Sequence, residues 1–223
     1  KLVMMSQKIK LAILISNAGT GTNLGAIIDG VKKGEINAQI CVVISDTQDA
    51  LGLERAKKHN LKIEICPKKE SLLPILEKYN PNFIALAGWK QIIDDKVITE
   101  FNNKILNLHP GLIPESINGV IKNPDGTDAL WNKGMLADKA IQNFLDKKST
   151  YAGSSIHFLT QEFDFGPVLD RTFEKMQDYD TVETLYMRLK KKENELYVKV
   201  LAKLCKKIMN KLKILIIGGG GRE

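Results

Sequence analysis

Asn107 and His109 stand two residues apart at the end of an apolar run that reads Ile105-Leu106-Asn107-Leu108-His109. Residues two apart on a β-strand project from the same face, so both polar side chains can converge on one atom. Pro110 follows directly and ends the strand, because it has no backbone N–H to donate. The pair therefore suits hydrogen-bond donation and proton transfer at one reacting group. The alternative is a histidine that is only hydrogen-bonded at a strand end.

A glycine-containing turn, Ser16-Asn17-Ala18-Gly19-Thr20-Gly21-Thr22-Asn23, joins the first apolar run to a helical segment. Glycines let the backbone turn tightly, and the N–H groups at a helix N-terminus attract an anion. The turn predicts a phosphate site with Gly19, Gly21, Thr22 and Asn23 as its residues. It matches neither G-x-G-x-x-G nor the Walker sequence, which argues against a dinucleotide or a nucleoside triphosphate. A glycine turn that binds no phosphate is the alternative.

A third polar group follows the strand-like run Ser154-Ser155-Ile156-His157-Phe158, in the loop Glu162-Phe163-Asp164-Phe165-Gly166-Pro167. Asp164 is a carboxylate at a strand end, where it can orient a histidine or move a proton. It is not part of a kinase D-F-G motif, because no glycine-rich loop, strand lysine or H-R-D accompanies it. The alternative is a turn residue that bonds its own backbone.

These residues need a scaffold, and the first half of the chain predicts one. Short apolar runs alternate with amphipathic segments between residues 9 and 109, as expected for strands covered on both faces. The pattern predicts an α/β fold, a doubly wound and mainly parallel sheet with right-handed crossovers and helices on both faces. The expected strands are 11–15, 39–44, 62–66, 83–87 and 104–108, and the expected helices are 23–33, 49–59, 69–79 and 94–101.

The second half of the chain has a different pattern of polar and apolar residues. A polar stretch over 115–126 precedes an expected helix over 127–145 and expected strands over 154–159 and 167–173. The last long element, an amphipathic helix over about 181–208, should pack against the sheet. No linker or internal repeat divides the chain, so we expect a single domain over 9–208 after an N-terminal tail over 1–8.

Composition limits the function classes. The 223 residues carry a net charge of +7, with 43% hydrophobic and 26% charged residues, which argues against disorder. No run approaches the roughly 18 apolar residues of a membrane helix. Much of the basic excess lies between 188 and 213, including Lys190, and we interpret it as a solvated helix face, with polyanion binding as the alternative. Three widely spaced cysteines indicate neither a disulfide framework nor a zinc site, and a cytoplasmic location is the default.

Taken together, the motifs resemble those of the phosphoribosylglycinamide formyltransferase family over about residues 9–205. The glycine turn is similar to the family's phosphate loop, and Ala85-Leu86-Ala87-Gly88-Trp89 to its segment beside the folate pocket. The run from Asn107 to Pro114 matches N-x-H-P-[SG]-L-[LI]-P. Gly153 to Phe158, with Asp164 to Pro167, matches G-x-S-x-H-F…D-x-G-P.

The resemblance implies formyl transfer from 10-formyltetrahydrofolate to the primary amine of 5'-phosphoribosylglycinamide, a step of purine biosynthesis, with no metal. It implies that Asn107 and His109 stabilise the oxyanion, while Asp164 tunes His109 and relays protons. A neutral His109 acting as base toward the amine stays an open alternative. The implied supporting residues are Gly19, Gly21, Thr22 and Asn23 for phosphate, Glu193 for the acceptor, Trp89, Lys90, Gln91 and Ile92 for folate, and Ser155 and His157 behind the site.

The sequence departs from the family pattern in three places. The phosphate loop is longer, Lys90-Gln91 replaces the usual Met-Arg, and residues 115–137 read as a different substrate-side loop. The alternative functions are those of a methionyl-tRNA formyltransferase, a sugar-amine formyltransferase and a non-catalytic ligand-binding module. We expect no RNA-binding domain after the long helix, which argues against the first, and the intact catalytic set argues against the last. We expect small-molecule substrates, and neither nucleic acid nor membrane as a partner.

The end of the chain carries a second pattern. Residues 209–223 read as a strand that runs into a glycine turn, Gly218-Gly219-Gly220-Gly221-Arg222-Glu223. This resembles the opening of phosphoribosylamine–glycine ligase, so we expect a truncated stub of a fused second enzyme. An adventitious C-terminal strand or tail is the alternative.

Overall fold

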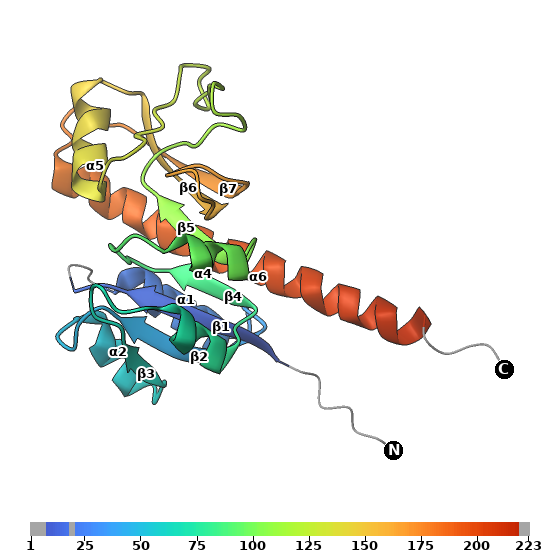
Figure 1. Ribbon diagram of the computed structural model, residues 1–223. Helices are drawn as coiled ribbons and strands as arrows, with labels where there is room; N and C mark the ends of the chain where they lie inside the picture. Colours follow the sequence, from blue (N-terminus) through green and yellow to red (C-terminus); the bar gives the residue numbers. More distant parts are fainter. Residues whose placement is uncertain (1–7, 18–20, 219–223) are drawn as a thin grey trace.

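The computed structural model describes residues 8–17 and 21–218, with side chains described as far as Asn210. Within these residues a seven-stranded sheet has the order β3-β2-β1-β4-β5-β6-β7, with helices packed around it (Figure 1). The elements are β1 (Ile9–Ile15), α1 (Thr22–Lys32), β2 (Ala38–Ser45), α2 (Gly52–Lys58), β3 (Ile63–Ile65), α3 (Leu73–Tyr79), β4 (Phe83–Leu86), α4 (Asp95–Glu100), β5 (Ile105–His109), α5 (Ala137–Asp146), β6 (Tyr151–Phe158), β7 (Val168–Lys175) and α6 (Val182–Gly218).

The sheet is mainly parallel, as the alternation of apolar runs predicts. Strands β1 to β5 pair in parallel, whereas β6 pairs antiparallel with β5 and β7 pairs antiparallel with β6. The chain starts in the middle of the sheet at β1, extends to one edge through β2 and β3, and then returns to β4 on the other side of β1. This reversal leaves a crevice between the carboxyl ends of β1 and β4, where ligands of open α/β sheets bind.

Helices cover both faces, because successive side chains of a strand point to opposite sides. Leu11, Ile13 and Ile15 of β1 pack in one core with α1, α2 and α6. Ala12 and Leu14 pack in the second core with α3 and α4. A third cluster joins α5 to the first turns of α6. The doubly wound architecture expected from the sequence is therefore confirmed.

The helix expected over 127–145 begins only at Ala137. Residues upstream cannot be helical: Asn132 and Gly134 have positive φ angles of 57° and 78°, and Lys122 pairs with Asp128 across a turn. Left-handed residues interrupt the repeating hydrogen bonds of a helix. The prediction was wrong for 127–136, which forms an irregular segment beside β5.

The strand expected near residue 214 is also wrong, because α6 continues to Gly218. A short apolar run cannot be assigned to strand or helix by its pattern alone. Here the run follows 27 helical residues without a proline or glycine between them, so extending the helix adds one hydrogen bond for each residue fixed. Residues 219–223 lie outside the described part of the chain, and the resemblance to a ligase stays a prediction.

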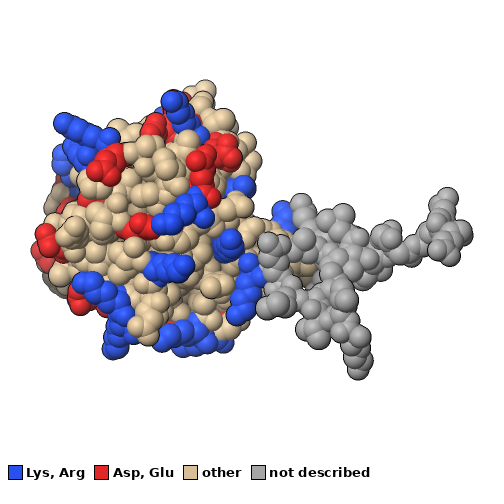
Figure 2. Space-filling view, turned by 60° about the horizontal axis from the view of Figure 1, so that its bottom comes forward, with Lys and Arg blue, Asp and Glu red and all other residues tan. Residues whose placement is uncertain are grey.

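Basic residues of α6, which the sequence places on a solvated face, form ion pairs with carboxylates of β7. Lys192 bonds Glu174 at 2.8 Å and Lys199 bonds Asp170 at 2.8 Å, so α6 is tied to β7 by ion pairs. On the face drawn in Figure 2, Lys and Arg side chains are spread over the surface, with Asp and Glu side chains among them in its upper part. None of the described helices combines the length and apolar character needed to cross a membrane.

Tyr197 of α6 ties the helix to the strand ends that carry the crevice. Its side chain is fully buried, and its hydroxyl donates to the Leu86 carbonyl at 2.8 Å, with the Leu106 carbonyl 3.2 Å away. Leu86 ends β4 and Leu106 lies in β5. A single phenol therefore sets the distance between α6 and the two central strands.

Tyr197→Phe is expected to lower the free energy of unfolding by about 1–2 kcal/mol, because buried carbonyl oxygens lose their donor. Tyr79→Phe is the matched control, since its hydroxyl donates to Glu64 at the surface and its loss should cost less than about 0.5 kcal/mol. Urea denaturation of both variants measures the difference. Equal losses would contradict a special role for the buried phenol.

Candidate active site

Two adjacent cavities lie at the carboxyl ends of β1, β4 and β5. The larger has a volume of about 340 Å³ and is lined by Asn107, His109 and Asp164 together with residues 88–93. The second, of about 280 Å³, is lined by residues 21–23, Asn107, Lys190 and Glu193. Asn107 and residues 88–90 line both cavities, so the strand end with the polar pair separates two neighbouring binding spaces.

His109 is buried to 2% exposure and has a protein partner on each ring nitrogen. Nε2 lies 2.6 Å from the Trp131 carbonyl oxygen, and Nδ1 lies 3.5 Å from Oδ1 of Asp164. Because a carbonyl only accepts hydrogen bonds, Nε2 carries a proton that it donates to Trp131, and Nδ1 faces the Asp164 carboxylate. The geometry therefore brings the imidazole and the carboxylate together at the end of β5.

Asp164 is held in a strained loop by several donors. Its φ angle is 49°, its Oδ2 accepts from the Gly134 N–H at 2.8 Å, and its carbonyl accepts from the Trp131 indole at 3.0 Å. Burial by itself would raise the pKa of Asp164, but the bond and charge of His109, with the Gly134 N–H, outweigh it and lower that pKa. The carboxylate therefore stays ionised opposite the imidazole.

His157 lies behind Asn107 and is neutral. Burial, with the nearby charge of His109, lowers the pKa of His157 to about 4. Its Nδ1 lies 3.0 Å from the Phe158 carbonyl, so Nδ1 carries the proton, and Nε2 accepts from Asn107 Nδ2 at 3.2 Å. This orientation leaves the second N–H and the oxygen of the Asn107 amide for a ligand. The residue expected behind the site thus determines which way Asn107 points.

Ser155 supports the chain where it leaves β5. Its hydroxyl donates to the Gly111 carbonyl at 2.7 Å and accepts from the Ile113 N–H at 3.0 Å. A Cβ at Gly111 would lie 1.8 Å from the Trp131 carbonyl oxygen. Only glycine therefore lets residue 131 approach His109 at this point.

The glycine turn lies at the N-terminus of α1. Gly21 has a φ angle of 68°, and a Cβ there would lie 2.9 Å from the Gly52 backbone, so glycine is needed. Thr22 Oγ1 and Asn23 Oδ1 are buried and have no hydrogen-bond partner among the described residues, which omit 18–20. Gly21, Thr22 and Asn23, for which the sequence predicts phosphate binding, line the 280 Å³ cavity, whereas Gly19 lies outside the described residues.

Glu193 lines the same cavity from α6 and is only 3% exposed. It accepts from the Ser154 hydroxyl at 2.6 Å and from Lys190 at 3.1 Å. Burial alone would lower the pKa of Lys190, but Glu193 and Tyr186 raise it, so the ammonium stays charged. Sequence reasoning missed Tyr186 and placed Lys190 on a solvated face. Their i, i+4, i+7 spacing with Glu193 is the signal that identifies one helix face.

The segment after β4 lies beside the larger cavity. Gly88 has a φ angle of 101°, and the Lys90 N–H donates to the Ser16 hydroxyl at 2.9 Å, which ties the segment to the end of β1. Trp89, Lys90, Gln91 and Ile92, for which the sequence predicts folate binding, line the cavity. Sequence reasoning missed two exposed apolar residues of its lining, Leu136 and Phe163, because the first lay in an expected helix.

Within the described residues, no three His, Cys, Asp or Glu side chains gather closely enough to hold a metal ion. The site instead combines a buried histidine beside a carboxylate, an oriented amide and an anion-favouring helix N-terminus. Such a set can bind a negatively charged group, stabilise a developing oxyanion and carry a proton.

Protonation of His157 is expected to destabilise the fold as the pH falls from 6.5 towards 4. Its pKa is about 4 in the folded chain, against 6.5 for an ordinary histidine, so the unfolded chain takes up the proton first. Above pH 6.5 this loss in the free energy of unfolding is absent, and at pH 5 it amounts to about 2 kcal/mol. Urea denaturation at pH 7.5 and pH 5 measures it.

His157→Gln, which can still accept from Asn107, should remove this part of the pH dependence. His59→Gln, at a half-buried histidine outside both cavities, controls for loss of a histidine. If the pH dependence of the free energy of unfolding decreased equally in the two variants, His157 would not be the group responsible.

Comparison with known proteins confirms the resemblance seen in the motifs. The formyl transferase family model matches residues 9–201. A phosphoribosylglycinamide formyltransferase of Haemophilus influenzae is 29% identical over 197 residues, covering 84% of this chain and 83% of that protein. The crystal structure of glycinamide ribonucleotide transformylase 1 from Symbiobacterium toebii superposes with a TM-score of 0.78 at 29% identity, covering 93% of this chain and 92% of that one.

Longer relatives are matched only in part. The chloroplastic phosphoribosylglycinamide formyltransferase of Arabidopsis thaliana is 29% identical over 206 residues, and the match covers 88% of this chain but 65% of that protein. A bovine protein named trifunctional purine biosynthetic protein adenosine-3 is matched over 18% of its length. With one family model spanning nearly all of the described sheet, the chain belongs to the formyl transferase family.

Proposed function

We propose that the chain transfers a formyl group from 10-formyltetrahydrofolate to the primary amine of 5'-phosphoribosylglycinamide, giving the formylated ribonucleotide of purine biosynthesis. The observation that carries the proposal is the placement of Asn107 on the boundary between two cavities, with the His109–Asp164 pair beside it. Relatives of similar length bear the name of this activity.

The 280 Å³ cavity suits the ribonucleotide. Gly21, Thr22 and Asn23 offer the N-terminus of α1 to the phosphate, and the Lys190 ammonium adds a positive charge to the wall. Glu193 offers a carboxylate that can accept from a hydroxyl or the amine. An acceptor held at both ends places its amine next to Asn107.

The 340 Å³ cavity suits the folate. Its lining is largely apolar and includes Trp89 and Ile92, with Leu136 and Phe163 among the exposed side chains. Apolar walls with a few polar groups are typical of sites for flat, aromatic ligands. Lys90 and Gln91 add polar contacts beside them.

Formyl transfer forms a bond from the amine nitrogen to the formyl carbon, breaks the bond from that carbon to N10, and moves one proton from the amine to N10. We assign oxyanion stabilisation to the free N–H of Asn107, for which one donor is typically worth about 3 kcal/mol. The charged His109 favours negative charge nearby, and Asp164 keeps it charged and can accept a proton. A direct bond from Nε2 would require His109 to exchange the Trp131 carbonyl for the formyl oxygen.

Small molecules are favoured over nucleic acid as substrates. The basic residues of α6 that face β7 are neutralised by Asp170 and Glu174, which leaves fewer free charges for a polyanion. Fusion to a ligase is a separate proposal, and the bovine relative, named trifunctional, is a precedent only for several activities in one chain. Reading the DNA beyond the codon for Glu223 tests it, and an unrelated continuation would refute it.

The test is an absorbance assay of the folate product with 10-formyltetrahydrofolate and glycinamide ribonucleotide. His109→Ala and Asp164→Asn should each lower kcat at least about 100-fold, because each removes part of the charged pair. Asp170→Asn is the matched control, since it changes a carboxylate that pairs with Lys199 outside the cavities. Its turnover should stay within about twofold of the parent.

Unchanged turnover in His109→Ala and Asp164→Asn would overturn the assigned roles. Turnover with a sugar amine or methionyl-tRNA, and none with the ribonucleotide, would keep formyl transfer and replace the acceptor. Absence of folate binding in a calorimetric titration would refute the enzyme as proposed.

A further inference from the structure

Residues 130–134, here called the Trp131 segment, lie between the exit of β5 and the loop that carries Asp164. The Leu112 N–H donates to the Leu130 carbonyl at 2.9 Å, and the Asn132 amide donates to the Pro110 carbonyl at 3.0 Å. From α5, the Asn143 amide donates to Asn132 Oδ1 at 2.8 Å. The segment is therefore anchored to the scaffold, although it belongs to the region that departs from the family motifs.

Trp131 contacts both members of the charged pair. Its carbonyl accepts from His109 Nε2 at 2.6 Å, and its indole N–H donates to the Asp164 carbonyl at 3.0 Å. The indole packs on Phe165 with ring centroids 5.7 Å apart, and the Lys133 ammonium lies 5.1 Å from the indole centroid. One residue thus reaches from β5 to the neighbouring loop.

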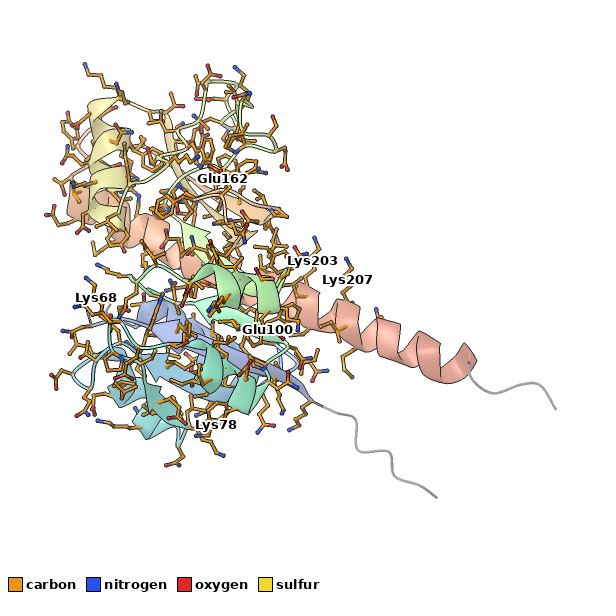
Figure 3. The ribbon with its side chains drawn as sticks, viewed as in Figure 1. Lys68, Lys78, Glu100, Glu162, Lys203 and Lys207 are labelled. Atoms are coloured by element: carbon orange, nitrogen blue, oxygen red, sulfur yellow. The ribbon has the colours of Figure 1, made fainter. Side chains whose placement is uncertain are left out.

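The loop of Asp164 needs such an anchor. Glu162 and Phe163 are exposed, and Asp164 has a left-handed backbone that a non-glycine residue adopts only at a cost. Lys133 also bonds Glu162 at 2.7 Å, and the Gly134 N–H donates to Asp164 Oδ2 at 2.8 Å, so the Trp131 segment holds the loop at two further points. In Figure 3 Glu162 lies in the upper part of the molecule, well away from Lys78 on α3.

We propose that Trp131 is a positioning residue that sets the placement of His109 relative to Asp164. The proposal rests on the proposed function for its effect on turnover, because the pair acts on the formyl group there. A displacement of about 1 Å in a catalytic group can cost 100-fold in rate, so an anchor of this kind acts on kcat. Trp131 lines neither cavity, and KM for both substrates should change little.

The first variant is Trp131→Phe, which keeps an aromatic ring against Phe165 and removes the N–H donated to Asp164. We expect kcat to fall about tenfold, with KM for the ribonucleotide and for the folate within about twofold of the parent. Tyr79→Phe is the matched control, since it also removes one aromatic donor, on α3 and outside both cavities. It should leave kcat unchanged.

A second readout does not depend on turnover. The chain has three histidines, so the imidazole protons can be assigned singly by ¹⁵N-resolved NMR. The His109 Nε2 proton, buried against the Trp131 carbonyl, should give a slowly exchanging signal in the parent and in Tyr79→Phe. In Trp131→Phe this signal should exchange at least about tenfold faster, because the indole no longer ties this segment to the Asp164 loop.

Gly111→Ala tests the contact between His109 Nε2 and the Trp131 carbonyl by a second substitution. The added Cβ would lie 1.8 Å from the Trp131 carbonyl oxygen and 3.0 Å from His109 Nε2, so the carbonyl must move away. The slowly exchanging proton should be lost in this variant too. Thermal unfolding of each variant confirms that the chain is folded when the spectra are compared.

A lower kcat together with a faster-exchanging His109 proton supports the proposal. An unchanged proton in Trp131→Phe overturns it, whatever the turnover, and so does an unchanged or higher kcat. If the parent transfers no formyl group, the proposed function fails, while the NMR comparison still decides whether Trp131 positions the pair.

Discussion

A histidine buried at the end of a central strand is the constraint on which the site depends. His109 is almost inaccessible to water, and a polar group in such a place must find protein partners. The Trp131 carbonyl and the Asp164 carboxylate supply them. Each partner comes from an irregular segment, so two loops must be held in position around one histidine.

That requirement explains much of the surrounding backbone. Gly111 leaves room for residue 131, and Ser155 bonds the Gly111 carbonyl and the Ile113 N–H. Asp164 adopts a left-handed conformation. Strain of this kind persists only where neighbouring contacts over-determine it. The rigid β5–β6 ladder, in which Asn107 pairs with His157 and His109 with Ser155, provides the base against which the loops are fixed.

The two buried histidines show how environment divides one side-chain type into two roles. His109 has two acceptors and sits opposite a carboxylate, whereas His157 has one acceptor and one donor. Burial lowers the pKa of His157 to about 4, so it stays neutral and orients the Asn107 amide.

Much of this protein was determined by its sequence alone. Alternating apolar runs led to the parallel sheet, because strands covered on both faces must be apolar throughout, and short motifs at strand ends led to the family and to Asn107, His109 and Asp164. Two elements failed: the helix expected from residue 127, which Asn132 and Gly134 interrupt, and the strand expected near 214, which α6 absorbs. Only the tertiary structure decided the partners of His109, the neutral state of His157 and the inward placement of Lys190. Those features depend on contacts between segments far apart in the chain, and the local sequence does not determine which acceptor a buried N–H will bond.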